Sequence, residues 1–347
     1  MEKITLLLLL PFYCLAQIPA YYSSVDFTQN AEDIKSQLSA LVTTTHTYQL
    51  IYTPDVWNAL KQSDLDPNDN TKVLLIYGYN DADAITSNDR TRSKDASCHT
   101  SSCAGLWVRE HVFAQSVGTP PLGQEGPGSD AHHLRAIDAQ MNNTRSNKKF
   151  TAGSGNAFSV STASWYPGDE WKGDVARMMM YMYLRYQSQC PPTNIGLGST
   201  SYSPLGDMPN IFLEWNQQDP VSQYELNRNV VLQSMQGNRN PFIDNPYLAT
   251  MIWGGPQAPD SWGVLATDAE IAEDNVVLYP TITTGIINVE NTGGRNFTYS
   301  AYNNLGQQVQ VQKSGSVIDM ANNAKGLYFV TLTDDAGKSK TFRIILN

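Results

Sequence analysis

Three short segments decide how this chain folds around a site: Arg109-Glu110-His111, Asp130-Ala131-His132-His133-Leu134 and Met141-Asn142-Asn143-Thr144-Arg145-Ser146-Asn147. They place an imidazole, hard oxygen ligands and several cations within one short stretch of the chain. Hydrolysis of a phosphodiester needs these groups: a base that deprotonates water, a divalent cation for the developing charge, and arginines that hold phosphate. The grouping therefore indicates chemistry of that kind.

The composition indicates a folded protein that is exported from the cytoplasm. The chain has 347 residues, of which 41% are hydrophobic, enough for a large domain and a small one. Residues 1–16 are typical of a signal peptide, with Lys3, an apolar run and small residues before a cut at Gln17. No later segment approaches the roughly twenty apolar residues of a membrane span. We therefore expect a secreted chain.

The formal net charge of −10 argues against a protein that binds nucleic acid through its overall charge. A local cationic groove can still act against an acidic background. The charge therefore leaves room for an enzyme that contacts nucleic acid only at its site.

Two cysteines enclose a short polar loop and predict a local disulfide in an oxidising compartment. They are Cys98 and Cys103. A zinc site built from this pair and His99 is the alternative, but the sequence offers no second pair of ligands. Cys190 is then left as a buried thiol, since Cys14 belongs to the signal peptide.

Hydrophobic spacing predicts a mixed helical domain with a few strands in the first part of the chain. Residues 30–43 have helical spacing with Asn30 as N-cap, and residues 72–79 and 107–113 read as strands. The second of these strands carries the Glu110-His111 pair.

Two further helices are predicted downstream. One follows Gly173-Asp174 as its cap and carries a methionine-rich stripe, which is typical of core. The other opens at Asp219-Pro220 and stops at Gly237.

The composition changes after residue 254. Residues 255–274 are rich in Gly, Pro and acidic residues and predict a linker. Beyond them, apolar and polar residues alternate in segments 286–290, 297–302, 308–311, 328–333 and 342–346. This pattern predicts a small antiparallel β-sandwich over residues 275–347, which leaves residues 17–254 as the catalytic domain.

Residues from about 20 to 250 resemble the secreted and periplasmic endonuclease I family, whose active site is a ββα-metal finger. The matching motifs are Arg109–Val112, Asp130–Arg135, Asn142–Asn147, Lys172–Arg177, Trp215–Pro220 and Gln236–Asp244. Phe113-Ala114 departs from the family's frequent Trp-Pro, and Leu134-Arg135-Ala136 lacks the proline of its Leu-X-Pro. We expect these departures to alter loop stiffness more than chemistry. The resemblance implies an α+β fold.

The β-rich tail resembles the C-terminal sorting domain of the type IX secretion system. Tyr279-Pro280, Lys325–Tyr328 and a last strand rich in Lys and Phe carry this match. It implies recognition by the secretion machinery and passage to the cell surface or beyond. Because the tail offers no catalytic constellation, we expect a chain ending near Pro259 to keep its activity.

The resemblance assigns the central roles to His111, Glu110 and Asn142. An unperturbed histidine titrates near pH 6.5 and can take a proton from water, so His111 is expected to be the general base. Glu110 and Asn142 offer the oxygen ligands that suit one Mg²⁺ ion, with Ca²⁺ or Mn²⁺ as substitutes. The alternatives are a buried structural histidine, a surface carboxylate and a turn or helix cap, and Asn143 competes with its neighbour for the ligand role.

Four more residues complete the predicted site. Arg145 is expected to act on the phosphate as a catalytic group and Arg109 to bind the substrate, with an ordinary ion pair as the alternative for either. His132 and Asn147 are expected to contact the substrate or orient the site, with structural hydrogen bonding as the alternative.

The predicted activity is sequence-non-specific, Mg²⁺-dependent endonucleolytic cleavage of DNA by a monomer, with RNA left open and 5′-phosphate ends. No base-reading module is evident, and backbone contacts carry no sequence information. A catalytically silent binding protein on the same scaffold is the chief alternative. A zinc hydrolase that uses both His132 and His133 fails, because adjacent histidines on a strand point apart.

Overall fold

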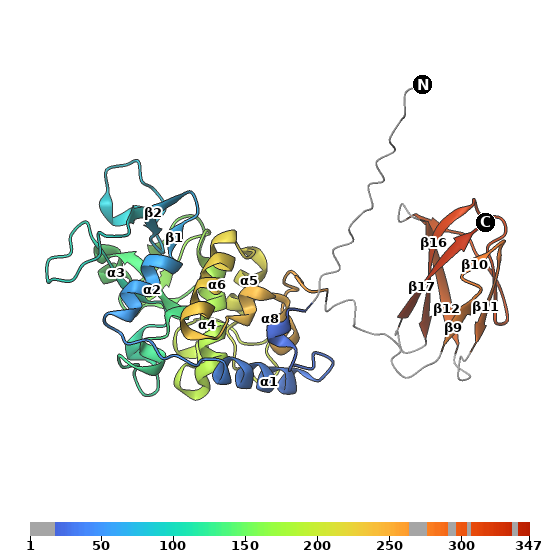
Figure 1. Ribbon diagram of the computed structural model, residues 1–347, viewed down its shortest axis with the longest axis horizontal. Helices are drawn as coiled ribbons and strands as arrows, with labels where there is room; N and C mark the ends of the chain where they lie inside the picture. The colour runs from blue at the N-terminus through green and yellow to red at the C-terminus, as the bar shows by residue number, and fades with distance from the viewer. Residues whose placement is uncertain (1–17, 264–275, 291–295, 304–306, 335–338) are drawn as a thin grey trace, which may run out of the picture. The chain divides into compact units, whose positions relative to one another are not determined.

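The computed structural model describes residues 18–263, 276–290, 296–303, 307–334 and 339–347. The chain divides into two compact units, Met1–Gly263 and Val264–Asn347 (Figure 1). The first mixes helices with short strands and the second is built of strands, which confirms the α+β class. The predicted signal peptide lies outside the described residues.

The first unit contains eight α-helices and eight strands among its described residues. The helices are α1 Ala31–Thr44, α2 Asp55–Ser63, α3 Ala139–Arg145, α4 Lys172–Tyr186, α5 Asn210–Gln218, α6 Gln223–Gln236, α7 Pro241–Asp244 and α8 Tyr247–Trp253. The strands are β1 Leu65–Asp66, β2 Asp69–Leu74, β3 Thr91–Ser93, β4 Trp107–His111, β5 Leu134–Asp138, β6 Lys149–Phe150, β7 Phe158–Ser159 and β8 Ser164–Tyr166. In the described parts of the chain, no helix is long and apolar enough to cross a membrane.

Helix α4 forms the centre of this unit. Figure 1 shows α4 and α6 in its middle, with α2 and α3 toward one end and α1, α5 and α8 toward the other. The predicted methionine stripe is core: Met178, Met179, Met180 and Met182 are buried. Buried ion pairs tie α4 to its neighbours, from Arg177 to Glu225 of α6 (2.6 Å) and from Asp174 to Arg135 of β5 (3.0 Å).

Several predicted element ends are confirmed and others are wrong. Asn30 caps α1 as expected, and Gly237 ends α6 in the left-handed conformation, with φ 93°. However, α6 begins after Ser222, whose hydroxyl and Glu225 form a capping box. That box supplies both reciprocal hydrogen bonds, so the helix begins there and not at Asp219-Pro220.

The two predicted strands and the predicted cap of α4 also differ from those in the structure. The strand expected over residues 72–79 is β2, which ends at Leu74 because Tyr77 turns the chain with φ 68°. The strand expected over 107–113 ends at His111. The Asp174 side chain does not cap α4, because it pairs with Arg135 instead.

The second unit consists of two sheets that share one core. Its strands are β9 Val277–Tyr279, β10 Ile282–Thr283, β11 Ile286–Glu290, β12 Phe297–Asn303, β13 Gln308–Val309, β14 Gln312–Ser314, β15 Val317–Asp319, β16 Gly326–Asp334 and β17 Ser339–Leu346. Their orders are β10-β17-β16-β12-β13 and β14-β15-β11-β9. The pair β10–β17 is parallel, and the other strand pairs of the second unit are antiparallel.

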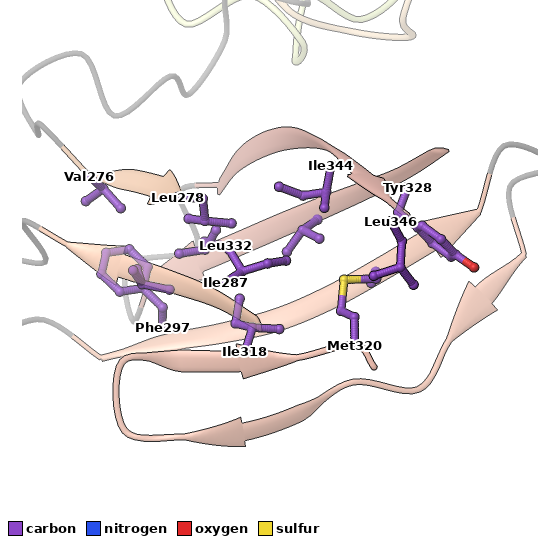
Figure 2. Close-up of a cluster of buried hydrophobic side chains, with 13 residues drawn as sticks. Val276, Leu278, Ile287, Phe297, Ile318, Met320, Tyr328, Leu332, Ile344 and Leu346 are labelled. Atoms are coloured by element: carbon purple, nitrogen blue, oxygen red, sulfur yellow. The ribbon is translucent and has the colours of Figure 1, made fainter. Parts of the chain in front are cut away.

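Alternation of buried and exposed residues explains this core. Leu278, Ile287 and Ile318 point inward from one sheet, and Phe297 and Leu332 point inward from the other (Figure 2). The described strands of the second unit therefore bury their apolar faces against each other.

Residues 255–263, expected to belong to a linker, pack on the first unit. The ring of Trp262, 6% exposed, lies 4.6 Å from the ring of Tyr22 and 5.7 Å from that of Phe27. The backbone NH of Tyr247 donates to the carbonyl of Pro259. The first unit thus extends to Gly263.

A chain that ends at Gly263 should be more stable than one that ends at Pro259. The shorter chain lacks Trp262, and removing a buried tryptophan side chain costs about 3–5 kcal/mol. Urea unfolding of the two chains, followed by circular dichroism, measures the difference. The matched control is Trp262→Ala in the longer chain, which should account for most of the loss. Equal unfolding midpoints for all three chains would show that this segment is a true linker.

Candidate active site

The central motifs meet in one compact unit made of β4, β5 and α3. Strands β4 and β5 pair antiparallel, with Glu110 opposite Arg135 and His111 opposite Leu134. Asp138 ends β5, and its carboxylate caps α3 by accepting from the NH groups of Gln140 and Met141. The end of β5 lies beside the start of β4, and Arg145 at the C-terminal end of α3 reaches back to the carbonyl of His111 at the end of β4.

A cavity of about 440 Å³ opens at this place. It is lined by Tyr52, Arg109, Glu110, His111, Ala114, Gln115, Ser116, Asn142, Arg145, Ser146 and Asn147. Six of the predicted site residues are among them, and Glu110 and His111 reach the same cavity although they are neighbours on one strand. Asn142 lines the cavity and Asn143 does not, so of these two neighbours only Asn142 offers its side-chain amide to the cavity.

His111 has the geometry of a base. Its Nε2 lies 2.9 Å from the carbonyl oxygen of Gly128. A carbonyl can only accept, so the ring proton is on Nε2 and the lone pair is on Nδ1. Burial lowers the pKa of His111 to about 3, with His133 acting in the same direction. The ring is therefore neutral at neutral pH, and its Nδ1 carries no proton.

The carboxylate of Glu110 is held from one side. It is 2% exposed, and its Oε1 accepts from the Tyr77 hydroxyl at 3.4 Å and lies 3.2 Å from Nη1 of Arg145. Burial raises its pKa to about 7, against the opposing effect of Arg145. No described residue donates to Oε2, which is also absent from the buried atoms that lack a partner. That oxygen is thus open to the cavity.

The donors in this cavity fit a Mg²⁺ ion. Mg²⁺ is a small, hard cation that binds through one or two protein oxygens and keeps several waters. Glu110 offers the open oxygen, and the side-chain amide of Asn142 forms no hydrogen bond with a described residue. Over the described ranges there is no cluster of three or more His, Cys, Asp or Glu residues that could hold a metal, which disfavours a zinc-type site.

Arg145 is not placed to grip a phosphate as expected. Its side chain is fully buried, and its Nη1 donates to the carbonyls of His111 and Ser146, both at 3.1 Å. Its Nη2 donates to the carbonyl of Val112 at 2.6 Å, and the guanidinium also pairs with Glu110. Both terminal nitrogens of Arg145 are therefore engaged by backbone carbonyls, and one of them also by Glu110.

Arg109 is the cation that faces the cavity. Its guanidinium lies between two aromatic rings, 3.6 Å from the centroid of Tyr52 and 4.2 Å from that of Trp57. Its Nη1 donates to the Tyr52 carbonyl and to the Thr53 hydroxyl. Among the described residues no carboxylate forms an ion pair with it, so the ion-pair alternative does not apply. Asn147 lines the same cavity, and its amide donates to the Ser116 hydroxyl at 3.2 Å.

His132 lies outside the cavity, against expectation. It is buried, its Nε2 lies 3.2 Å from the carbonyl of Asn238, and its ring packs 4.5 Å from that of Tyr181. It belongs to a polar network around Asp130, which accepts from the hydroxyls of Tyr181 and Tyr186 at 2.7 and 2.9 Å. His132 is thus held by structural contacts and does not line the cavity, which favours the structural alternative.

The disulfide is confirmed just ahead of β4. Cys98 and Cys103 are joined, with their Cα atoms 5.4 Å apart, and the NH of Cys98 donates to the carbonyl of Trp107. Both sulfurs are thus unavailable to zinc. Cys190 is buried and unpaired.

The partners that hold the candidate site residues in place could not be predicted from the sequence. Tyr52, Tyr77 and Gly128 all touch the central side chains, yet none lies in a motif with chemistry of its own. Their roles arise only when distant segments fold onto β4, and no local pattern gives a signal for them.

Comparison with known proteins shows two families along the chain. Residues 30–247 match the family described as Endonuclease I, and residues 277–347 match the family described as Secretion system C-terminal sorting domain. An extracellular ribonuclease of Bacillus subtilis (strain 168) is 36% identical over 248 residues, which cover 69% of this chain and 80% of the relative. An extracellular ribonuclease of Bacillus amyloliquefaciens is 38% identical over 251 residues, 69% of this chain and 79% of the relative.

Proposed function

We propose that this chain, which belongs to the endonuclease I family of phosphodiester hydrolases, is a secreted Mg²⁺-dependent endonuclease that cuts nucleic acid without sequence specificity. One observation carries the proposal. A neutral His111, an open Glu110 oxygen, the Asn142 amide and the Arg109 cation line one cavity.

The proposed reaction begins at His111. Its Nδ1 takes a proton from a water molecule, which attacks phosphorus while the bond to the 3′-oxygen breaks. The carbonyl of Gly128 fixes the ring and its tautomer, and Arg145 fixes the backbone carbonyls of His111 and of the next residue, Val112. Arg109 holds the non-bridging phosphate oxygens, and the departing 3′-oxygen takes its proton from solvent. The products carry 5′-phosphate and 3′-hydroxyl ends.

Glu110 and Asn142 would hold the metal ion. Bound Mg²⁺ supplies electrostatic stabilisation of the charge that develops on the phosphate. In this proposal β4, β5 and α3 together are the ββα-metal finger, and the second unit is a β-sandwich that the secretion machinery recognises.

RNA is proposed as a substrate beside DNA. The two similar bacterial proteins are extracellular ribonucleases, and hydrolysis by an activated water does not involve the 2′-hydroxyl. Backbone contacts through Arg109 read no base, so we expect no sequence preference. The match to a sorting domain and the extracellular relatives support action outside the cell, and a monomer is the expected state.

Incubation of the purified mature chain with RNA and with plasmid DNA tests this proposal. We expect both to be cut in the presence of Mg²⁺ and neither in EDTA. Equal cutting in EDTA would contradict the metal requirement. Binding without cutting under every metal condition would instead favour a silent nucleic-acid-binding protein.

Replacing either proposed ligand should weaken the response to metal. We expect Glu110→Gln and Asn142→Ala each to raise the Mg²⁺ concentration for half-maximal activity by at least about tenfold, since even the outer partners of a metal ligand are worth that much. Cleavage rates across a Mg²⁺ titration measure this shift.

The matched control is Asn143→Ala, which removes the neighbouring exposed amide that does not line the cavity. Its titration should follow that of the natural chain. If all three variants show the natural metal response, the ligands lie elsewhere.

A further inference from the structure

A second cavity of about 640 Å³ lies beside the catalytic cavity. We infer that it is a subsite for a nucleotide of the single strand being cut, with a phosphate at Arg185; this inference rests on the proposed function. Its lining is Gln49, Leu50, Ile51, Tyr52, Thr53, Gln124, Glu125, Gly126, Arg185 and Tyr186. None of these residues except Tyr52 lines the catalytic cavity.

The two cavities share the residue Tyr52 and are linked by one loop. Tyr52 lines both, and its ring stacks on His111, with centroids 5.5 Å apart and planes at 26°. Residues 124–126 line the second cavity, and Gly128 of the same loop holds the His111 ring. A strand whose phosphate is at His111 therefore passes over Tyr52 when it continues into the second cavity.

Arg185 provides the charge that such a strand needs. In the described structure its guanidinium forms no hydrogen bond and no ion pair, and its Nε is buried without a partner. By contrast, the fully buried Arg177 and Arg228 are paired with carboxylates. Glu125 is the one acid in the lining, and it forms no ion pair with Arg185. An unpaired cation in a groove wall is available to a phosphate.

Part of the remaining lining is apolar and aromatic, and it suits an unpaired nucleobase. Ile51 is 60% exposed, and the Tyr52 hydroxyl has no hydrogen-bond partner among the described residues. The ring of Tyr186 lies 4.7 Å from the Arg185 guanidinium and is fixed by its bond to Asp130. Apolar and aromatic walls beside one cation are the arrangement that binds unpaired bases and their backbone. The ligand is thus a single strand of RNA or DNA.

Binding of a long single-stranded oligonucleotide in EDTA, followed by fluorescence anisotropy, tests the subsite without any need for cleavage. We expect Arg185→Gln to raise Kd by about tenfold, since one charge-assisted contact is lost. The slope of log Kd against log salt should fall by about 0.7, the value for one phosphate contact on a single strand. Arg185→Lys should restore the slope. Binding of a dinucleotide, which fills only the catalytic cavity, should not change.

A second pair of variants tests the subsite independently, in case Arg185→Gln does not fold. Ile51→Glu puts a carboxylate on the exposed wall of the groove and should weaken binding of the long strand. Val230→Glu makes the same change on α6 at 57% exposure, outside both cavities, and should not. Arg90→Gln, which removes an arginine paired with Glu170 on the surface, is the control for loss of charge.

The subsite is overturned if Arg185→Gln and Ile51→Glu both bind the long strand with the natural Kd and salt slope. Failure of the proposed function has a different result. In that case the natural chain binds the strand in EDTA but does not cut it when Mg²⁺ is added.

Discussion

His111→Ala should lower the rate of phosphodiester cleavage by about 10²–10⁴-fold, the usual contribution of a general base. The substitution removes the lone pair on Nδ1 but leaves Glu110 and Asn142 in place. Binding of nucleic acid in EDTA should therefore be close to that of the natural chain. Single-turnover cleavage rates measure the loss, and anisotropy measures the binding.

His99→Ala is the matched control for this experiment. His99 is exposed on the disulfide loop, and it packs on Trp57 outside the cavity. Its removal should leave the rate within a few-fold of the natural value. If His111→Ala keeps the natural rate, another group accepts the proton and the assignment of the base is wrong.

Arg145→Met should destabilise the first unit by about 3–5 kcal/mol and also abolish cleavage. Breaking a buried ion pair by removing one partner leaves the other charge uncompensated, which is the reason for a cost of this size. Here the charge of Glu110 and the carbonyls of His111 and Val112 all lose their donor. Urea unfolding followed by tryptophan fluorescence measures the loss, because all 7 tryptophans lie in the first unit.

Arg109→Met distinguishes the role of Arg109 from that of Arg145. Arg109 is half-buried and unpaired with any described acid, so its loss should raise KM and lower activity with a much smaller change in unfolding free energy. If instead Arg145→Met has natural stability and only a raised KM, then Arg145 does contact the phosphate as the sequence suggested.

The fold could be predicted where the signal is local. The alternation over residues 286–290 matches β11, and the cap at Asn30 begins α1, because each depends on near neighbours in sequence. Prediction failed where two local signals compete. Asp219-Pro220 resembles a helix start, but the reciprocal bonds of Ser222 and Glu225 define it.

The site could be predicted as a set of residues but not as a set of roles. Motif order identified six residues that line one cavity, since β4, β5 and α3 follow one another closely. The role of Arg145 depends on carbonyls that only the folded chain brings to it, and His132 turns toward Asn238 in a distant segment. Side-chain direction of this kind is set by tertiary packing, which a single sequence does not display.

Cleavage of RNA in water enriched in oxygen-18 tests the central claim most directly. The account predicts one heavy oxygen on each new 5′-phosphate and unlabelled 3′-hydroxyl ends, because a water activated at His111 attacks phosphorus. Mass spectrometry of the products reads this out for the natural chain in Mg²⁺. Products with 2′,3′-cyclic phosphate or 3′-phosphate ends would contradict it, since they require attack by the 2′-hydroxyl or departure of the 5′-oxygen.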